Sequence, residues 1–307
     1  MPTVIILLVL LVSMFLVIVV RSSYLQRRPF SLPEPSHHSW DEILLLPQPI
    51  TLRTLSTGTM KSLLSGIMNL EDGQDQDIKD ELVQYPVNVH IFHHQELGSY
   101  LIDAGLDASY VHNPLGSMKG IMAKRRLGRA TQQPNSDIAT ILDREKVRIR
   151  GVFLTHMHFD HTAGILDLPK DIPYFVSKDE RYENFRFFFH GDHLAGVEEI
   201  YDIDMAEGIE LPPFGKSVDV FGDGSLWAIS SSGHSRGHLM YFINGIEGQI
   251  LMTGDACNTQ FQFDTGIGPG SFSSNIEQAQ VALDRIKVFM ERYPQVRLVY
   301  GHDLPER

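Results

Sequence analysis

The 307-residue chain contains a single cysteine, Cys257. One thiol excludes a disulfide framework, and it also excludes a zinc cluster built from cysteines. Cations are scarce as well, with 26 Lys and Arg against 38 Asp and Glu and a formal net charge of −12. Nucleic acid is therefore not expected as a partner, since phosphate backbones are held by clustered cations. Apolar residues make up 43% of the chain, which is enough to bury a full core and excludes disorder as the main state.

Charge is absent between Val4 and Val20, where Ser13 is the only polar residue. As a helix this run would measure roughly 26 Å at about 1.5 Å per residue, close to the thickness of a bilayer's hydrocarbon core. It lacks the basic start and small-residue end of a cleaved signal peptide, which is the alternative interpretation. Three arginines follow within eight residues, so the positive-inside rule places the next domain on the cytoplasmic side. We therefore expect residues 1–20 to be the transmembrane anchor of a single-pass membrane protein.

The remainder of the chain divides into two parts by composition. Residues 21–50 contain five prolines among scattered polar residues and are expected to form a tether. Residues 51–307 contain no internal repeat or low-complexity tract, so we expect one domain. Alternating apolar residues predict a strand over 87–91, and the pattern Ser274-x-x-Glu277 predicts the start of an amphipathic helix. Strands interleaved with amphipathic helices indicate a layered α/β fold.

Histidines gather at one point of the sequence. The segment after the apolar strand 152–154 carries His156, His158, Asp160 and His161. Side chains two residues apart on a strand point to the same side, and the following turn can bring the other two into the same cavity. Four such ligands would fill one tetrahedral zinc and leave no catalytic position, so the pattern favours two adjacent metal ions.

Three more polar segments stand at the ends of predicted strands, and they contribute His234, Asp255 and His302. Loops at strand ends collect into active sites, so these side chains are candidates for the same centre. With these segments in this order, the chain resembles the metallo-β-lactamase superfamily, and within it the dinuclear-zinc lactonases that open N-acyl-homoserine lactones. The resemblance covers Pro86 to Asp303, and it implies a four-layer αββα sandwich.

The resemblance also implies a ligand set, which we carry over position by position. His156, His158 and His234 would hold the first metal ion. Asp160, His161 and His302 would hold the second, and Asp255 would bridge both. Two Zn²⁺ ions are implied, while Fe, Mn and Co remain open. Such a pair lowers the pKa of a bridging water, so that hydroxide can attack an ester carbonyl and Asp160 can move the proton.

Four other residues near these motifs receive separate interpretations. Asp103 matches an aspartate that orients ligands in the family, and His238 is expected to be a hydrogen-bonded supporting histidine. Cys257 lacks a paired base and is not expected to act as a nucleophile. Asn258 stands where the lactonases have a tyrosine that helps polarise the substrate carbonyl. An amide can also donate a hydrogen bond, so Asn258 is a catalytic candidate together with Asp160.

The expected activity is metal-dependent hydrolysis of a small-molecule lactone or ester. Hydrolysis of a β-lactam or thioester also begins with attack on an electrophilic carbonyl carbon, and it is the first alternative. An inactive, membrane-tethered interaction module is the second alternative, although such a protein would be expected to lack ligands and none is missing. A phosphodiesterase is disfavoured by the acidic balance. The expected partners are thus a small-molecule substrate and a membrane contacted through residues 4–20, and the oligomeric state stays open.

Overall fold

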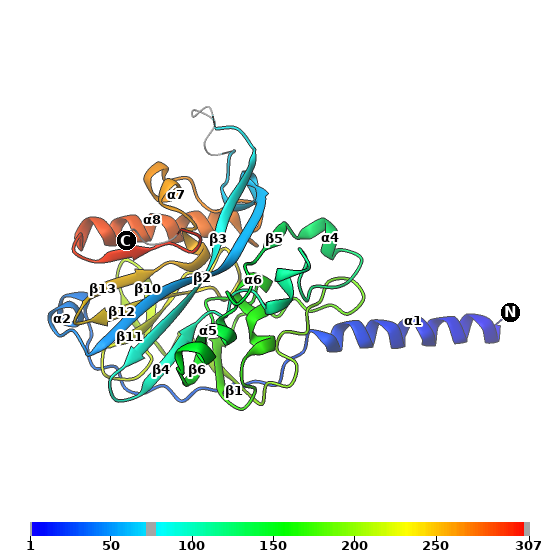
Figure 1. The fold of residues 1–307 in the computed structure, drawn as a ribbon, viewed down its shortest axis with the longest axis horizontal. Coiled ribbons are helices and arrows are strands. Elements are labelled where there is room, and N and C mark those ends of the chain that lie inside the picture. Colours follow the sequence, from blue (N-terminus) through cyan, green and yellow to red (C-terminus); the bar gives the residue numbers. More distant parts are fainter. Residues whose placement is uncertain (1, 72–77, 304–307) are drawn as a thin grey trace.

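The protein is described by a computed structural model that places residues 2–71 and 78–303 (Figure 1). Its strands are named in chain order: β1 (Arg28–Pro29), β2 (Ile50–Leu63), β3 (Leu82–His94), β4 (Gly98–Ile102), β5 (Arg129–Thr131), β6 (Ile149–Phe153), β7 (Pro173–Ser177), β8 (Glu199–Ile203), β9 (Ile209–Leu211), β10 (Gly215–Asp219), β11 (Leu226–Ser230), β12 (Leu239–Gly245), β13 (Gly248–Met252) and β14 (Arg297–Val299). The helices are α1 (Pro2–Ser22), α2 (Trp40–Leu45), α3 (Leu64–Ile67), α4 (Ala123–Arg126), α5 (Ile138–Glu145), α6 (Phe159–Thr162), α7 (Gln260–Thr265) and α8 (Ile276–Arg292).

Within these described residues, the strands form two mixed sheets. One has eight strands in the order β1-β8-β7-β6-β4-β3-β2-β5, and the other has six in the order β14-β13-β12-β11-β10-β9. Strands β4, β6, β7 and β8 run parallel, as do β13 and β14, whereas the long β2–β3 hairpin is antiparallel. Parallel neighbours bring the loops after their carboxyl ends to one edge of each sheet.

The two sheets pack face to face through a shared apolar cluster, to which Phe92 and Phe153 of one sheet and Tyr241 and Met252 of the other contribute. The outer face of the six-stranded sheet is covered by α8, whose buried apolar residues recur with helical period. On the other side, α5 packs against β6 and β7. The result is a sheet sandwich with helices on both outer faces, as the resemblance implied.

Residues 28–50 do not form the expected tether. Strand β1 pairs in parallel with β8, and the Trp40 side chain is buried against Trp227 and Phe289. Ile43 is fully buried in the same cluster. Prolines limit regular helix here to the short α2, but they do not prevent packing, and the apolar area of the tryptophan stabilises the docked segment. The tether expectation was wrong for this segment, which belongs to the folded domain.

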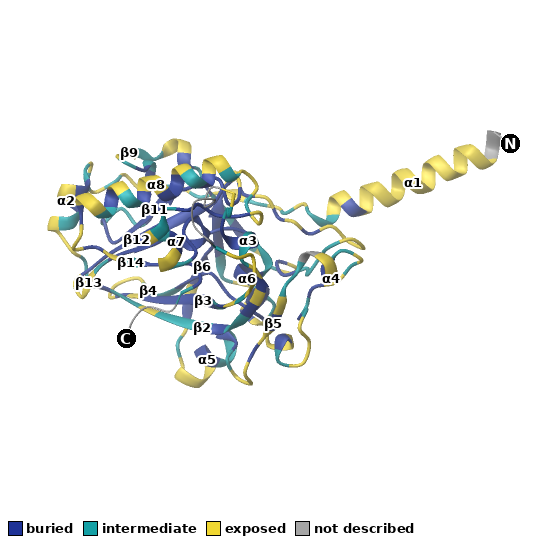
Figure 2. Cartoon of the chain, turned by 90° about the horizontal axis from the view of Figure 1, so that it is seen from above, coloured by how far each residue is buried: buried dark blue, intermediate teal, exposed yellow. Residues whose placement is uncertain are grey.

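Helix α1 extends away from the domain, and nearly all of its surface is exposed (Figure 2). By length and composition, Val4–Ser22 is a candidate membrane span, a property it shares with signal sequences at this position. Exposure of so many large apolar side chains in water would be unfavourable, which agrees with a partner for this helix outside the described chain.

Candidate metal centre

The candidate residues lie in loops that follow β4, β6, β11, β13 and β14, at one edge of the sandwich. After β6 the chain turns at His158, which is the residue preceding α6 and has extended backbone angles. This turn places Asp160 and His161 on the first turn of the helix. The rings of His156 and His158 lie 4.5 Å apart, as expected for two strand-end side chains on one side.

Glycine permits the close approach of a second loop. Gly233 has a φ of +144°, and a Cβ at this position would lie 2.3 Å from the backbone nitrogen of Ala279 in α8. A side chain is therefore excluded, and only glycine lets this loop pass over the helix start. As a result His234 enters the centre, where its ring lies 4.8 Å from that of His156.

Asp255 occupies the middle of the centre, and its two carboxylate oxygens face different histidines. Its Oδ2 lies 3.2 Å from Nε2 of His234 and 3.8 Å from Nε2 of His156. Its Oδ1 lies 3.3 Å from Nε2 of His161 and 3.4 Å from Nε2 of His302. The seven candidates thus separate into two groups that could each hold a metal ion, namely His156, His158, His234 and Asp255 in one and Asp160, His161 and His302 in the other.

Most of these imidazoles are oriented by a partner at Nδ1. His161 donates from Nδ1 to Asp103 at 2.8 Å, and His302 donates from Nδ1 to the carbonyl oxygen of Pro86 at 2.8 Å. Nδ1 of His156 lies 3.0 Å from the Thr155 hydroxyl, and Nδ1 of His234 lies 3.3 Å from that of Ser273. An Nδ1–H held this way leaves the Nε2 lone pair to face the centre, which is how metal-binding histidines are commonly fixed. Nε2 of His234 lies there within 2.9 Å of Nδ1 of His158.

The donor set itself tests whether a metal ion fits. Among the described residues, Nε2 of His156, Nε2 of His161 and Oδ1 of Asp255 are buried and have no hydrogen-bond partner. Buried polar atoms without a partner are costly, so three of them converging on one point indicate a group that supplies the missing interactions. Imidazole nitrogen and carboxylate oxygen are ligands suited to zinc and similar divalent ions. The residues present fit a pair of such ions.

The pKa values of the residues in the centre are shifted by burial and by the charges of their neighbours. Burial, followed by the charges of His161 and His158, holds the pKa of His156 well below its ordinary value. Burial also opposes the charged form of His161, yet Asp103, Asp255 and Asp160 together raise its pKa well above the usual range. Neighbouring imidazoles hold the pKa of Asp255 well below its usual value in spite of burial. His156 is therefore held neutral, whereas the surrounding carboxylates favour positive charge at His161.

Asp103 and His238 support the centre from behind. Asp103 has a left-handed φ of 60°, which turns its carboxylate toward the backbone N–H and hydroxyl of Thr155 as well as toward His161. Burial lowers the pKa of His238 to about 4, and its Nε2 accepts a hydrogen bond from the backbone N–H of Asp255. That nitrogen is thus occupied, which confirms the interpretation of His238 as a supporting residue.

Asn258 and Cys257 lie next to Asp255 but differ in their access to the centre. Asn258 lines the pocket, and its side-chain nitrogen donates to the carbonyl oxygen of Ile67 at 3.0 Å. One of its two side-chain N–H bonds is therefore engaged with the backbone of Ile67, and its backbone carbonyl oxygen accepts from the backbone N–H of His302. Cys257 is fully buried on the side of the apolar core, and burial raises the pKa of its thiol far above the ordinary value.

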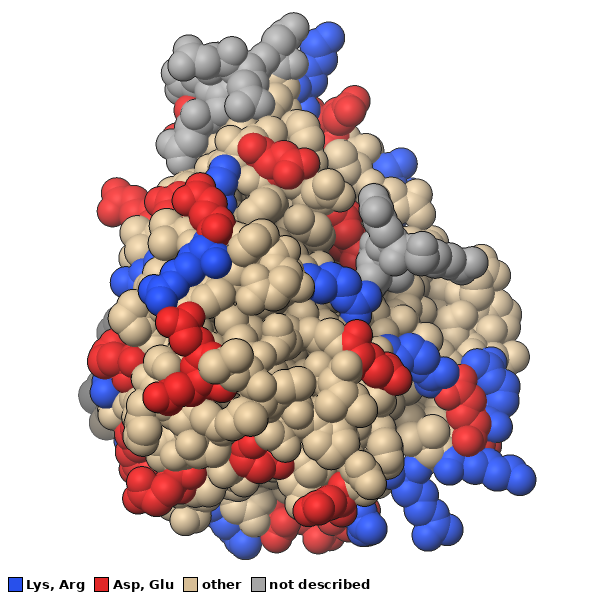
Figure 3. Space-filling view, turned by 90° about the vertical axis from the view of Figure 1, so that its left-hand side faces the viewer, with Lys and Arg blue, Asp and Glu red and all other residues tan. Residues whose placement is uncertain are grey.

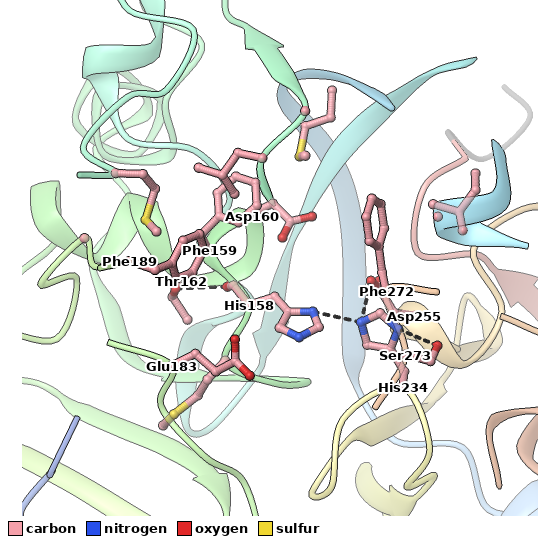
Figure 4. Close-up of a pocket in the computed structure, with 18 of the residues that line it drawn as sticks. His158, Phe159, Asp160, Thr162, Glu183, Phe189, His234, Asp255, Phe272 and Ser273 are labelled. Atoms are coloured by element: carbon pink, nitrogen blue, oxygen red, sulfur yellow. Dashed lines mark hydrogen bonds and ion pairs between the residues drawn. The ribbon is translucent and has the colours of Figure 1, made fainter. Parts of the chain in front are cut away.

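A pocket of about 500 Å³ opens in front of the centre (Figure 4). Figure 4 shows His158, Asp160 and Thr162 on one wall and His234, Phe272 and Ser273 on the other. Much of the remaining wall is apolar, with contributions from Met60, Ile67, Met118, Leu127, Met157, Phe159 and Phe189. A ligand with a polar reacting group and an apolar extension would match this division.

Sequence reasoning missed three residues that shape the centre. Tyr85 packs against His302 with ring centroids 4.8 Å apart and the ring planes tilted by 60°, and Ser273 contacts His234. Glu180 is buried, and it accepts hydrogen bonds from the N–H of Met157, the N–H of Gly237 and the hydroxyl of Ser235. Each belongs to a segment without a metal-ligand pattern of its own, so no local signal could have identified it.

Comparison with known protein families identifies the superfamily of the chain. Residues 83–302 match the family model of the metallo-beta-lactamase superfamily, and the chain belongs to this superfamily. Among curated proteins, the chain is 26% identical over 260 residues to the N-acyl homoserine lactonase AttM of Rhizobium johnstonii, a match that covers 83% of this chain and 93% of the relative. It is 29% identical over 129 residues to the probable metallo-hydrolase YflN of Bacillus subtilis, covering 38% of this chain and 47% of that protein.

Solved structures show the same fold. An N-acyl homoserine lactone hydrolase with the product N-hexanoyl-L-homoserine at its catalytic metal centre aligns with a TM-score of 0.66 and 19% identity. The alignment covers 84% of this chain and 95% of the other. The dizinc quorum-quenching lactonase AidC aligns with a TM-score of 0.52 and 15% identity, covering 84% and 88% of the two chains.

Proposed function

We propose that the protein is a dinuclear metal hydrolase that opens a lactone or a related carboxylic ester. The observation that carries this proposal is the position of Asp255, whose two carboxylate oxygens face separate groups of imidazoles. His156, His158 and His234 would hold one ion and Asp160, His161 and His302 the other. The lactonase relatives, which match over 83% of the chain, support the choice of substrate class.

Two bound divalent ions would supply Lewis acidity, which activates water and polarises a carbonyl oxygen. The chain's own residues supply position and proton transfer. Asp160 lies in the pocket wall with its Oδ2 3.6 Å from Nε2 of His161 and 3.8 Å from Nε2 of His302. There it can accept the proton of the attacking water and return it to the leaving alkoxide. The remaining N–H bond of Asn258 is available to a substrate oxygen, with Thr162 and Ser273 nearby as polar wall residues.

For ring opening, the carbonyl group of the substrate must lie at the metal centre while the apolar part of the substrate binds to another wall of the pocket. The apolar wall formed by residues such as Phe159, Phe189 and Phe272 provides that second contact. Full burial of one aromatic side chain contributes about 1.5–3 kcal/mol, and a partial contact with the substrate contributes a fraction of that. The acidic chain offers few cations to a phosphodiester, which is why this substrate class is not proposed.

A substrate panel on the zinc-loaded full-length protein tests the proposal. We expect kcat/KM to be highest for lactones, compared with β-lactams, thioesters and phosphodiesters of similar size. Chelation should abolish the activity and added zinc should restore it. Faster hydrolysis of another class would replace the lactonase proposal with that class, and a lack of activity toward every class would favour the inactive interaction module.

We further infer that α1 stays in the mature protein as a single membrane span, with the domain on the cytoplasmic side. Its length and its exposed apolar surface support this inference. Alkaline carbonate extraction should leave the protein in the membrane pellet. A soluble mature chain that begins near residue 21 would instead establish a cleaved signal peptide.

A further inference from the structure

We propose that the rim of the pocket is inserted into the surface of an anionic bilayer, so that the pocket takes amphiphilic substrates from the membrane. The rim consists of residues 117–125 and 185–190, and we call these two segments the lip. The part of the proposal that concerns substrates rests on the proposed hydrolase function. The part that concerns the bilayer does not depend on the hydrolase function and rests on the inferred membrane span of α1.

The two segments of the lip are joined by backbone hydrogen bonds. Lys119 and His190 exchange N–H···O bonds of 2.8 and 3.0 Å, and Ile121 donates to the carbonyl oxygen of Phe187 at 3.1 Å. Met118, Arg125 and Phe189 of the lip also line the pocket. The inner side of the lip is thus the pocket wall, and whatever contacts its outer side is close to the pocket entrance.

The outer side of the lip is apolar and exposed. Ile121 is 72% exposed, while Phe187, Phe188 and Phe185 are 51%, 38% and 37% exposed. Phe187 has a left-handed φ of 72°, a conformation that is costly for a bulky residue. Contiguous exposed apolar side chains of this kind mark an interaction surface. The strained turn keeps an aromatic ring at the tip of the lip.

Helix α1 sets the depth at which the lip would meet a bilayer. The ring of Phe15 lies 5.5 Å from that of Phe187 and 6.0 Å from that of Phe188. Phe15 precedes Val20 by five residues, or about 7–8 Å along the helix axis at 1.5 Å per residue. If α1 spans the membrane, both rings reach the interfacial depth of about 5–10 Å at which amphipathic segments insert.

The base of α1 is fixed to the pocket wall, so the depth is not arbitrary. Ser22 donates from its hydroxyl to the carbonyl oxygen of Asn184 at 2.7 Å, and the Asn184 side chain donates back to the carbonyl oxygen of Ser22 at 2.8 Å. Asn184 lines the pocket. Figures 1 and 2 show α1 leaving the domain on the same side as α4, which belongs to the lip.

Charge around the lip differs from that of the whole chain. Residues 108–136 contain five cations and no Asp or Glu, although the chain carries a net charge of −12. Lys119, Lys124 and Arg125 are exposed, whereas Asp107 accepts a hydrogen bond from Ser117 of the first segment and Asp192 pairs with Arg186 of the second segment. On the face that points away from α1, acidic and basic side chains are interspersed (Figure 3). An apolar tip surrounded by cations is complementary to a leaflet rich in anionic lipid.

Fluorescence quenching by lipid tests the position of the lip in the full-length protein. The native Trp40 and Trp227 are buried and give a constant background. In vesicles of phosphatidylcholine and phosphatidylserine with brominated acyl chains, we expect Phe187→Trp to be quenched at least twofold more than the matched control Phe261→Trp. Phe261 is 50% exposed on α7, away from the lip. Equal quenching of the two variants would overturn the proposal.

A charge variant tests the preference for anionic lipid. Lys119→Glu combined with Lys124→Glu should reduce the quenching of Phe187→Trp in vesicles with phosphatidylserine and leave it unchanged in pure phosphatidylcholine. Quenching that does not depend on these lysines or on phosphatidylserine would overturn the electrostatic part of the proposal. Neither lysine lines the pocket or belongs to the candidate centre.

Kinetics test whether substrates enter from the bilayer. With the protein in the same vesicles without bromine, Phe188→Ser should raise KM for a dodecanoyl-homoserine lactone about 5- to 10-fold and leave kcat/KM for the water-soluble butanoyl compound unchanged. An equal effect on both compounds would overturn the entry route. Absence of activity in the unmodified protein would refute the proposed function, while the quenching result would still decide where the lip lies.

Discussion

At the scale of single residues, Asp255 has the largest expected influence on the centre, because one of its carboxylate oxygens faces each group of imidazoles. Its backbone N–H is held separately by His238, and the preceding Gly254 has a left-handed φ of 48°. The position of the loop therefore depends little on the carboxylate itself. Removal of the carboxylate should affect chemistry far more than folding.

We expect Asp255→Ala to lower kcat by at least about 10³-fold, since the groups can then no longer share a ligand, while the circular dichroism spectrum stays unchanged. Steady-state kinetics of purified protein measure the effect. Asp264→Ala on α7 is the matched control, because Asp264 is exposed and outside the pocket. Near-normal turnover by Asp255→Ala would show that this aspartate is merely a turn residue.

Asp103 offers a second prediction at this scale. Asp103→Asn keeps a residue type that tolerates the left-handed backbone, but its amide cannot accept hydrogen bonds from Thr155 and His161 at both oxygens. We expect zinc affinity to fall about 10- to 100-fold, as for other residues that orient metal ligands. Competition with a chromogenic chelator measures the affinity. An unchanged affinity would mean that His161 is fixed without Asp103.

At the scale of elements, the sequence predicted best where a pattern is local. The alternation at 87–91 lies within the longer β3, and the apolar run at 152–154 overlaps the end of β6. The expected start of α8 was one residue off, because Asn275 caps the helix by accepting from Gln278, while the Ser274 hydroxyl donates to the carbonyl oxygen of Gly233. Both residues are good caps, and the tertiary contact of Ser274 decides between them.

The candidate site was also predictable in part for physical reasons. Ligand-type residues such as His156 and His161 are concentrated in short motifs, so their chemistry is visible in the sequence. Tyr85 and Glu180 come from segments whose relation to the centre is created only by folding. The packing of residues 28–50 was missed because proline content describes local backbone preference, whereas burial of Trp40 is a tertiary effect.

Glu180 connects the loop after β6 with the loop after β11, and burial raises the pKa of its carboxyl group. In Glu180→Gln, an amide N–H₂ would face donors that now bind the carboxylate, so we expect a loss of about 1–3 kcal/mol in unfolding free energy. Zinc affinity should fall too, because both loops carry candidate ligands. Urea unfolding and chelator competition measure these effects, and Glu199→Gln on β8, where the side chain is partly exposed, is the control. Equal behaviour of the two variants would contradict this account.

At the scale of the whole molecule, stability should depend on buried neutral histidines. Burial lowers the pKa of His90 and of His193 to about 4. Near pH 6.5 these histidines bind protons in the unfolded chain but not in the folded chain. The contribution of each neutral histidine to the unfolding free energy is therefore fully present above pH 6.5. As the pH falls toward 4, this contribution is lost, by up to about 3 kcal/mol per histidine.

His90→Gln tests this dependence, because glutamine can still contact the Thr54 hydroxyl that lies 2.9 Å from Nδ1 of His90. The variant should be less stable than the unmodified protein at pH 7, and the difference should shrink as the pH falls to 4. Urea unfolding at several pH values measures it. A difference that is independent of pH would contradict the assignment of a neutral, buried His90.

The central claim, a centre for two metal ions, is tested most directly by metal analysis of the purified, zinc-replete protein. Elemental analysis should give close to two ions per chain, because the seven candidate ligands form two groups around Asp255. His302→Ala should reduce the value to about one, since it removes a ligand from one group only. One ion or fewer in the unmodified protein would contradict the dinuclear centre and the mechanism derived from it.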